Sequence, residues 1–157
     1  MRIRILITFM VFNVLFSLFG CFGEAKKTVT SVEGMKLIIR TMRGGYVYKL
    51  EGNGEETELR RYRETYRGGE DDLLLESSVS CSMQMMIELM NSFGILRWNG
   101  FHGKHPRNVN DGKMFIFTAT VNDGQEIFAD GSVILPKGYH DFLSSLDAML
   151  QRTKTTE

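Results

Sequence analysis

The stretch MFIFTATVNDGQEIFADGS, residues 114–132, decides the fold because it predicts two antiparallel strands joined by a short loop. A two-residue turn at Asp123 and Gly124 places Phe117 opposite Asp130. A three-residue loop, built as a type I turn that closes on a left-handed Gly124, pairs Phe117 with Ala129 instead. We predict the three-residue loop, because its register places the apolar side chains of both strands on one face: Phe115, Phe117, Ala119, Val121, Ile127 and Ala129.

Helical spacing of apolar residues is found on both sides of this hairpin. Upstream, after Ser82 and before a terminating Gly94, the apolar residues are Met83, Met86, Ile87, Met90 and Phe93. Methionine commonly fills irregular cores, so we interpret this stripe as core rather than as a metal- or peptide-binding surface. Downstream, Pro136 and Asp141 suit the start of a second helix. Its apolar stripe consists of Tyr139, Phe142, Leu143, Leu146, Met149 and Leu150.

The N-terminal half contains four runs typical of strands, separated by glycines: MKLIIRTM (35–42), GYVYKLE (45–51), TELRRYRETYR (57–67) and DLLLESSV (72–79). The third run also fits a helical spacing through Leu59, Tyr62 and Tyr66, but its position between hairpin turns favours a strand with Arg61 and Arg63 toward water. The order of elements predicts one α+β domain over residues 34–153. We expect an antiparallel β-sheet with two amphipathic helices packed on one face.

The N-terminus has the features of a secretory signal. Arg2 and Arg4 precede an apolar segment of fifteen residues, from Ile5 to Phe19, and Gly20 follows it. This segment is shorter than the roughly 20 residues that a transmembrane helix requires. We therefore favour a cleaved signal over a permanent membrane span.

The segment Leu18-Phe19-Gly20-Cys21 resembles the lipobox of bacterial lipoproteins. The resemblance implies that residues 1–20 are the signal peptide, that Cys21 carries the lipid, and that residues 21–33 form a tether. The domain would then be lipid-anchored at the cell membrane, on its extracytoplasmic side. An ordinary signal peptide is the alternative. With Cys21 lipidated, Cys81 has no disulfide partner, and we expect it to be a buried, unreactive thiol.

The charge of the processed chain argues against nucleic acid as a partner. Removal of residues 1–20 leaves 137 residues with 17 basic and 19 acidic side chains, a formal charge of −2. Nucleic-acid-binding domains normally carry a strongly basic face. The length suits a single domain.

The segment WNGFHGKHPRNVNDG, residues 98–112, is the candidate functional loop. In the structural interpretation, Trp98 and Phe101 cover one end of the core, and the glycines permit the bends. In the binding interpretation, the loop is a contact patch made of Trp98, Phe101, His102, Lys104, His105 and Arg107.

A metal or enzymatic site in the same loop would use His102, His105 and Asp111. The spacing fits no familiar zinc motif, and Gly103 and Pro106 disfavour a helical presentation of the two histidines. The sequence has no nucleophile elbow and no phosphate-binding loop. We therefore predict neither a metal nor a cofactor, and no catalytic residue is assigned.

The C-terminal third, through WNGF, two Asp-Gly pairs and PKGYHDF, resembles a group of uncharacterised secreted and lipoprotein domains of anaerobic bacteria. That resemblance implies a fold and no catalytic residues. Two hypotheses follow. The first is a non-enzymatic lipoprotein that binds a protein or an envelope polymer. The second is a small envelope enzyme or metal-binding protein that uses the 98–112 loop.

Overall fold

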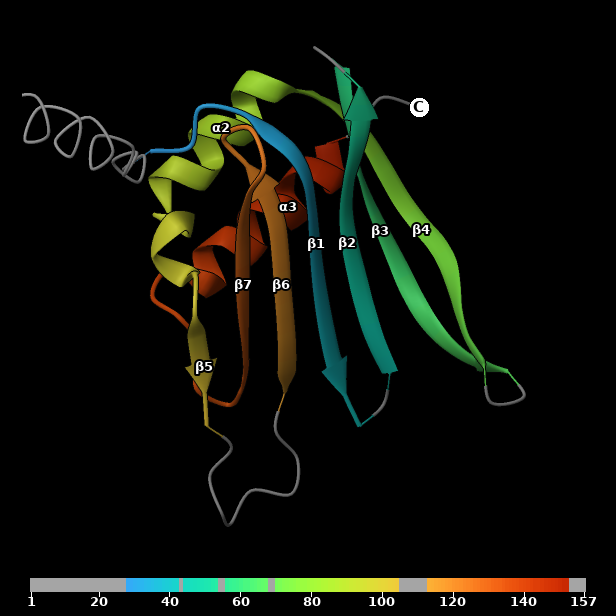
Figure 1. Ribbon diagram of the computed structural model, residues 1–157. Helices are drawn as coiled ribbons and strands as arrows, with labels where there is room; N and C mark the ends of the chain where they lie inside the picture. The colour runs from blue at the N-terminus through green and yellow to red at the C-terminus, as the bar shows by residue number, and fades with distance from the viewer. Residues whose placement is uncertain (1–27, 43, 54–55, 68–69, 105–112, 153–157) are drawn as a thin grey trace, which may run out of the picture.

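A computed structural model describes residues 28–42, 44–53, 56–67, 70–104 and 113–152 (Figure 1). Seven strands, two α-helices and one 3₁₀ helix make up the described chain. In sequence order they are β1 (Val32–Thr41), β2 (Gly44–Asn53), β3 (Glu56–Arg67), β4 (Glu70–Ser82), α2 (Met83–Ser92), η1 (Ile95–Trp98), β5 (Phe101–Gly103), β6 (Met114–Val121), β7 (Gln125–Ser132) and α3 (Tyr139–Arg152).

The strands form one sheet in the order β4-β3-β2-β1-β6-β7-β5. All neighbours are antiparallel except β5 and β7, which are parallel. The described part of the chain is thus a mixed α and β fold with a mostly antiparallel sheet and two α-helices, as the sequence predicts at that level. The sheet dominates the fold more than we expected, because β3 and β4 extend into a long hairpin and β5 adds a short edge strand (Figure 1).

The register of the β6–β7 hairpin is confirmed. Phe117 pairs with Ala129, and the three residues from Asn122 to Gly124 form the loop. The predicted type I turn is wrong, because Asn122 and Asp123 adopt positive φ angles of 52° and 64°. The Asn122 side chain accepts a hydrogen bond from the Thr30 amide at 2.6 Å, and its amide group donates to the Thr28 carbonyl at 3.0 Å. These contacts hold the loop in its left-handed conformation.

Residues 57–67 are a strand, as predicted, but the expectation that Arg61 points toward water is wrong. Arg61 lies on the same face as the buried Leu59, since alternate residues of a strand share a face. Its guanidinium donates to Asp147 of α3 at 2.9 Å and lies 3.2 Å from Glu76. The counter-charges on α3 and β4 thus let this arginine be largely buried. Arg63, by contrast, is more than half exposed.

Both predicted helical stripes belong to the core. Ser82 caps α2, accepting a hydrogen bond from the Met85 amide, and Met86 and Met90 are fully buried below it. From α3, Phe142 and Leu146 are fully buried. They form one cluster with the buried residues of the hairpin and of β1, and with Cys81, which is a buried free thiol as predicted.

The domain begins earlier than the predicted boundary at residue 34. Val29 and Val32 are buried in the core, and the Val29 amide donates to the Asn91 side chain at 2.8 Å. Residues 28–33 are therefore part of the domain rather than tether. The predicted signal peptide, Cys21 and the rest of the tether lie outside the described residues. Among the helices that the structure describes, none has the length and hydropathy needed to cross a membrane.

Candidate functional site

Trp98 lies at the junction between the core and the surface. It ends η1 and is 2% exposed. Its indole packs edge-on against Phe117 of β6 and Phe142 of α3, with ring centroids 5.2 and 5.5 Å apart. The indole nitrogen donates to the backbone carbonyl of Lys137 at 3.1 Å. That hydrogen bond ties η1 to the segment that leads into α3.

A cleft of about 620 Å³ opens beside Trp98. One wall is the end of α2 with the left-handed Gly94, and the other is the start of α3. Its lining residues are Asn91, Ser92, Phe93, Gly94, Arg97, Trp98, Phe101, Pro136, Lys137, Gly138 and Asp141. The volume falls in the range of about 300–1,000 Å³ that is usual for ligand sites. We call it the Trp98 cleft.

Rigid aromatic rings line the Trp98 cleft on its inner side. The Phe93 ring packs on Phe142, with centroids 6.0 Å apart, and the Phe101 ring packs on Phe115, with centroids 6.3 Å apart. Together with Trp98, these rings are fixed by core neighbours rather than by a ligand. The apolar lining of the cleft is therefore already formed.

Charged side chains stand at the mouth of the cleft. Arg97 and Lys137 are exposed there, and Asp141 in the first turn of α3 is also exposed. The charged lining therefore carries one net positive charge. The arrangement is suited to hold an apolar group against the rings and an anionic group near the two cations.

The structure separates the predicted loop residues into two groups. Trp98 and Phe101 line the Trp98 cleft together. His102 is exposed and follows Phe101 on β5, so its side chain points to the other side of the strand. Lys104 is exposed beyond the end of β5, whereas His105, Arg107 and Asp111 lie outside the described residues.

His102 has an acidic partner that we did not predict. Its Nδ1 atom lies 2.7 Å from the Asp130 carboxylate on β7, the strand that pairs with β5. Such a contact orients an imidazole ring, but the His102 side chain is about two-thirds exposed. In the residues that the structure describes, His, Cys, Asp and Glu side chains do not gather in a group of three suited to a metal ion.

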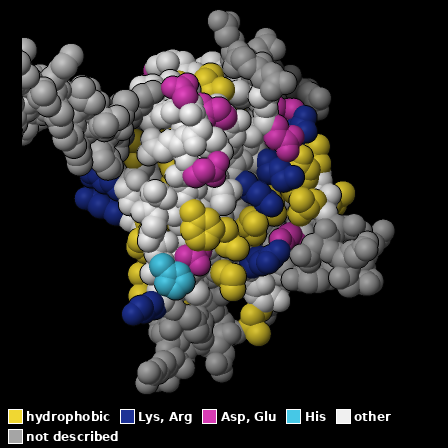
Figure 2. All heavy atoms as spheres, viewed as in Figure 1, with side chains coloured by type: hydrophobic (Ala, Val, Ile, Leu, Met, Phe, Trp, Pro, Cys, Tyr) yellow, Lys and Arg dark blue, Asp and Glu magenta, His cyan; other side chains and the backbone are white. Residues whose placement is uncertain are grey.

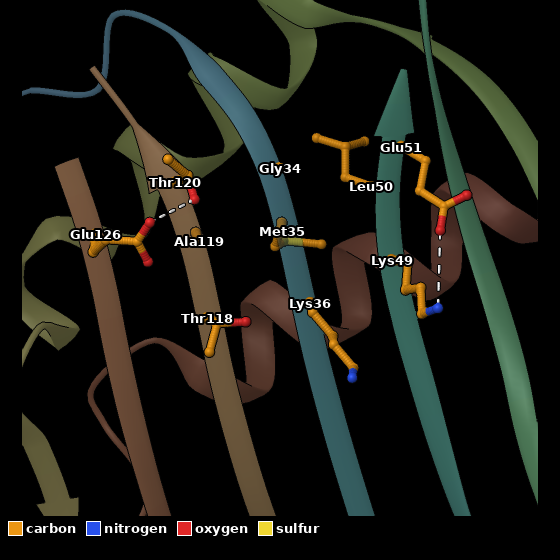
Figure 3. Close-up of a pocket in the computed structure, with 10 residues that line it drawn as sticks. All are labelled: Gly34, Met35, Lys36, Lys49, Leu50, Glu51, Thr118, Ala119, Thr120 and Glu126. Carbon is orange, nitrogen blue, oxygen red and sulfur yellow. Dashed lines mark hydrogen bonds and ion pairs between the residues drawn. The ribbon is translucent and has the colours of Figure 1, made fainter. Parts of the chain in front are cut away.

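A second hollow lies on the sheet surface over Gly34, with a volume of about 250 Å³ (Figure 3). Lys36, Lys49, Glu51, Thr118, Thr120 and Glu126 surround it. Several of its polar groups already pair with one another. Thr120 donates to Glu126 at 3.1 Å, and Lys49 lies 3.9 Å from Glu51. Figure 2 shows this side of the molecule, where hydrophobic side chains alternate with lysines and arginines over the strands. The Trp98 cleft is larger and has aromatic side chains in its lining, so it is the stronger candidate site.

A polar network beneath α3 has a structural role. The Tyr48 hydroxyl donates to Asp147 at 2.8 Å, and Asp147 also accepts from Arg61. Burial, followed by the nearby Asp147 carboxylate, raises the pKa of Tyr48 well above its usual value. The hydroxyl is thereby kept as a neutral donor, and the network fixes α3 to β2 and β3.

Sequence reasoning missed Arg97, Lys137 and Asp130. Arg97 and Lys137 are forty residues apart and line the same cleft only in the folded chain, where the Trp98 indole donates to the Lys137 carbonyl. Asp130 joins His102 only through a three-residue parallel strand, which is too short to give a periodic pattern. The one available signal was the solitary tryptophan before a Gly-rich stretch, and this tryptophan lines the cleft.

Comparisons of the chain with protein-family models, with curated proteins and with solved structures found no match.

Proposed function

We propose that the protein is a lipid-anchored, extracytoplasmic binding module without enzymatic activity, and that the Trp98 cleft is its binding site. The proposal of an anchor rests on Leu18-Phe19-Gly20-Cys21 after the apolar segment. The proposal of binding rests on one observation: a cleft of about 620 Å³ with preformed aromatic walls and two cations at its mouth.

We infer further that α2 and α3 pack on a single face of the sheet. In support, buried residues of both helices share one cluster with alternate residues of β1 and β6, such as Leu37 and Phe117. The side chains between them, such as Lys36 and Thr118, lie around the hollow on the sheet surface. In this arrangement the cleft opens where the helical layer ends.

The chemistry of the cleft favours an acidic protein segment that carries an apolar side chain. An aromatic or aliphatic side chain would displace water from the partly exposed surfaces of Phe93 and Phe101. A carboxylate beside it would lie near Arg97 and Lys137. The aromatic side chains of the cleft are already fixed by their neighbours. Less conformational entropy is therefore lost on binding, because few side chains of the protein have to become ordered.

Trp98 provides a direct test, because it is the only tryptophan in the chain and lines the cleft. We suggest titrating the protein with a short peptide of glutamate and phenylalanine while recording tryptophan fluorescence. Binding in the cleft should change the emission in a saturable manner. Arg97→Ala combined with Lys137→Ala should weaken binding at least about tenfold, the effect of about 1.4 kcal/mol.

Lys36→Ala is the matched control, since it also removes an exposed cation but lies at the Gly34 hollow. It should leave the titration unchanged. A peptide in which phenylalanine is replaced by alanine should bind more weakly. If anionic envelope polysaccharide changes the emission and the peptide does not, the partner is an envelope polymer. If neither changes it, the cleft is not the binding site.

A further inference from the structure

The described chain enters the domain at the rim of the Trp98 cleft. Val29 is buried, and the Asn91 side chain holds its backbone through two hydrogen bonds. The Val29 amide donates to Asn91 at 2.8 Å, and the Asn91 amide group donates to the Val29 carbonyl at 2.9 Å. Asn91 lies in the last turn of α2 and also lines the cleft. The segment that precedes β1 therefore starts beside the end of α2 (Figure 1).

The residues just before this entry point are long enough to reach the cations of the cleft. Arg97 follows Asn91 by six residues of helix and turn, which span roughly 12 Å at a rise of about 2.0 Å per residue. From Thr28, an extended chain spans roughly 14 Å to Glu24 and roughly 20 Å to Phe22. A link this short gives an effective concentration on the order of millimolar, so that even a weak contact within one chain is populated.

The segment FGEAKK, residues 22–27, combines the two kinds of side chain that the cleft is suited to hold. Phe22 is its one large apolar residue, and Glu24 is its one acid. The first matches the partly exposed phenylalanine rings of the lining, and the second matches the two cations at the mouth. The chain thus carries, next to its own cleft, a segment of the chemistry that the cleft favours.

The order of charges in this segment also matches the cleft. Position matters here, because the segment and the charged lining each carry one net positive charge. Lys26 and Lys27 are the residues nearest in sequence to Val29, and hence to the C-terminal end of α2. A helix C-terminus favours cations, and the last turn of α2 contains no basic residue of its own. Glu24 comes next, as the two cations of the lining come after the end of α2.

We propose that Phe22 and Glu24 of the chain itself dock in the Trp98 cleft, with Phe22 against the rings and Glu24 toward the two cations. The proposal rests on the proposed function, because it takes the cleft to be a site for an apolar and acidic segment. An outside ligand of that kind must then displace the chain's own segment. Because Phe22 directly follows Cys21, the proposed carrier of the lipid, docking also holds the cleft near the membrane surface.

Photocross-linking of the full chain tests the docking without any foreign ligand. Phe22 is replaced by the photoreactive analogue p-benzoylphenylalanine, and the linked peptides in the monomer band of a denaturing gel are identified by mass spectrometry. We expect links to residues 91–101 or 136–141, which contain the lining of the cleft. Leu74 replaced by the same analogue is the matched control, because Leu74 is 58% exposed on β4, at the other edge of the sheet from β5. The proposal is wrong if position 22 gives no such link, or if position 74 gives the same links.

A titration with the peptide of glutamate and phenylalanine measures the competition. Phe22→Ala combined with Glu24→Ala should bind this peptide at least about threefold more tightly than the wild-type chain, the gain expected if the segment fills about two-thirds of the free clefts. Leu74→Ala also removes an exposed apolar side chain and should bind as the wild type does. Equal affinity of the double variant and the wild type contradicts the docking. If the peptide binds neither chain, the proposed function fails, and the cross-links still decide whether the segment docks.

Discussion

At the scale of single residues, Trp98 serves both the core and the cleft. Its ring contacts with Phe117 and Phe142 connect the sheet to α3, and its nitrogen finds a backbone acceptor, as a buried indole requires. The sequence allowed both a structural and a binding interpretation for this tryptophan. They are compatible, because a side chain that is almost fully buried in the core can still contribute to the wall of a cleft.

Trp98→Ala should lower the free energy of unfolding by roughly 3–5 kcal/mol, the range for a large buried aromatic side chain. His102→Ala should change it by less than about 0.5 kcal/mol, since His102 is mostly exposed. Urea denaturation followed by circular dichroism measures both values. Equal, small effects of the two substitutions would contradict the core role of Trp98.

Tyr139 gives a prediction about pH. It is buried at the start of α3, and this burial raises its pKa from the usual 10 to about 12. The neutral form is thus favoured in the folded state, and the resulting stability is complete below pH 10 and lost as the pH rises through 12. Tyr139→Phe should flatten the decline in melting temperature over this range. An unchanged decline would show that Tyr139 does not contribute to it.

At the scale of elements, secondary structure and register can be predicted from the sequence where the alternation or helical spacing of apolar residues is long. The eight-residue strands β6 and β7 alternate so regularly that a shift by one residue would turn their buried side chains, such as Phe115, Phe117 and Ile127, to the outer face, and their register was predicted correctly. The β6–β7 turn was not, because its conformation depends on the contacts of Asn122 with residues 28–30, far away in the sequence. The buried position of Arg61 depends in the same way on Asp147 of α3.

Asn122→Ala should therefore destabilise the domain by about 2 kcal/mol or more, because it removes side-chain hydrogen bonds to Thr28 and Thr30 and places alanine at a positive φ. Asp123→Gly should cost little, since glycine adopts the positive φ of that position without strain. Chemical denaturation of the two variants measures the change in the free energy of unfolding that each substitution causes. A larger cost for Asp123→Gly would contradict this account of the loop.

A Cβ atom on Gly45 would meet two neighbours, the backbone carbonyl oxygen of Ile39 at 2.7 Å and the Glu64 carboxylate of an ion pair that crosses β2. Glu64 of β3 accepts hydrogen bonds from Arg40 of β1 at 3.0 and 3.1 Å, and its carboxylate occupies the space where a Cβ atom on Gly45 would lie. Gly45→Ala should destabilise the sheet by about 1–3 kcal/mol through overpacking. Adding Glu64→Ala should recover part of that loss in a double-mutant cycle, and strict additivity would contradict the proposed steric conflict.

At the scale of the whole molecule, the sequence predicted one mixed domain, both helices and the six long strands, because each has a hydrophobic pattern of its own. It did not predict the extent of the sheet or the meeting of Arg97 with the segment that begins α3. Such features arise from packing between elements remote in the chain. Trp98 therefore pointed to the region of the candidate cleft from the sequence, whereas the charged residues at the opening of that cleft became apparent only from the fold.

The last prediction concerns where the molecule resides, and the two cysteines supply the test. If Cys21 carries the lipid, Cys21→Ala should move the chain from the membrane fraction to an unprocessed or soluble form, and mass spectrometry of the wild-type N-terminus should find an acylated Cys21. Cys81→Ala should stay in the membrane fraction, because Cys81 is buried against Thr57, with its sulfur 3.3 Å from the hydroxyl. Residue 28 already belongs to the domain, and it follows Cys21 by seven residues. A fully extended chain of that length spans at most roughly 25 Å between the two residues. An anchored domain would therefore stand close to the membrane surface, within reach only of partners in that layer of the envelope. If the membrane fraction contains a chain that still begins with an unmodified Met1, the proposal of a lipid anchor on Cys21 is wrong.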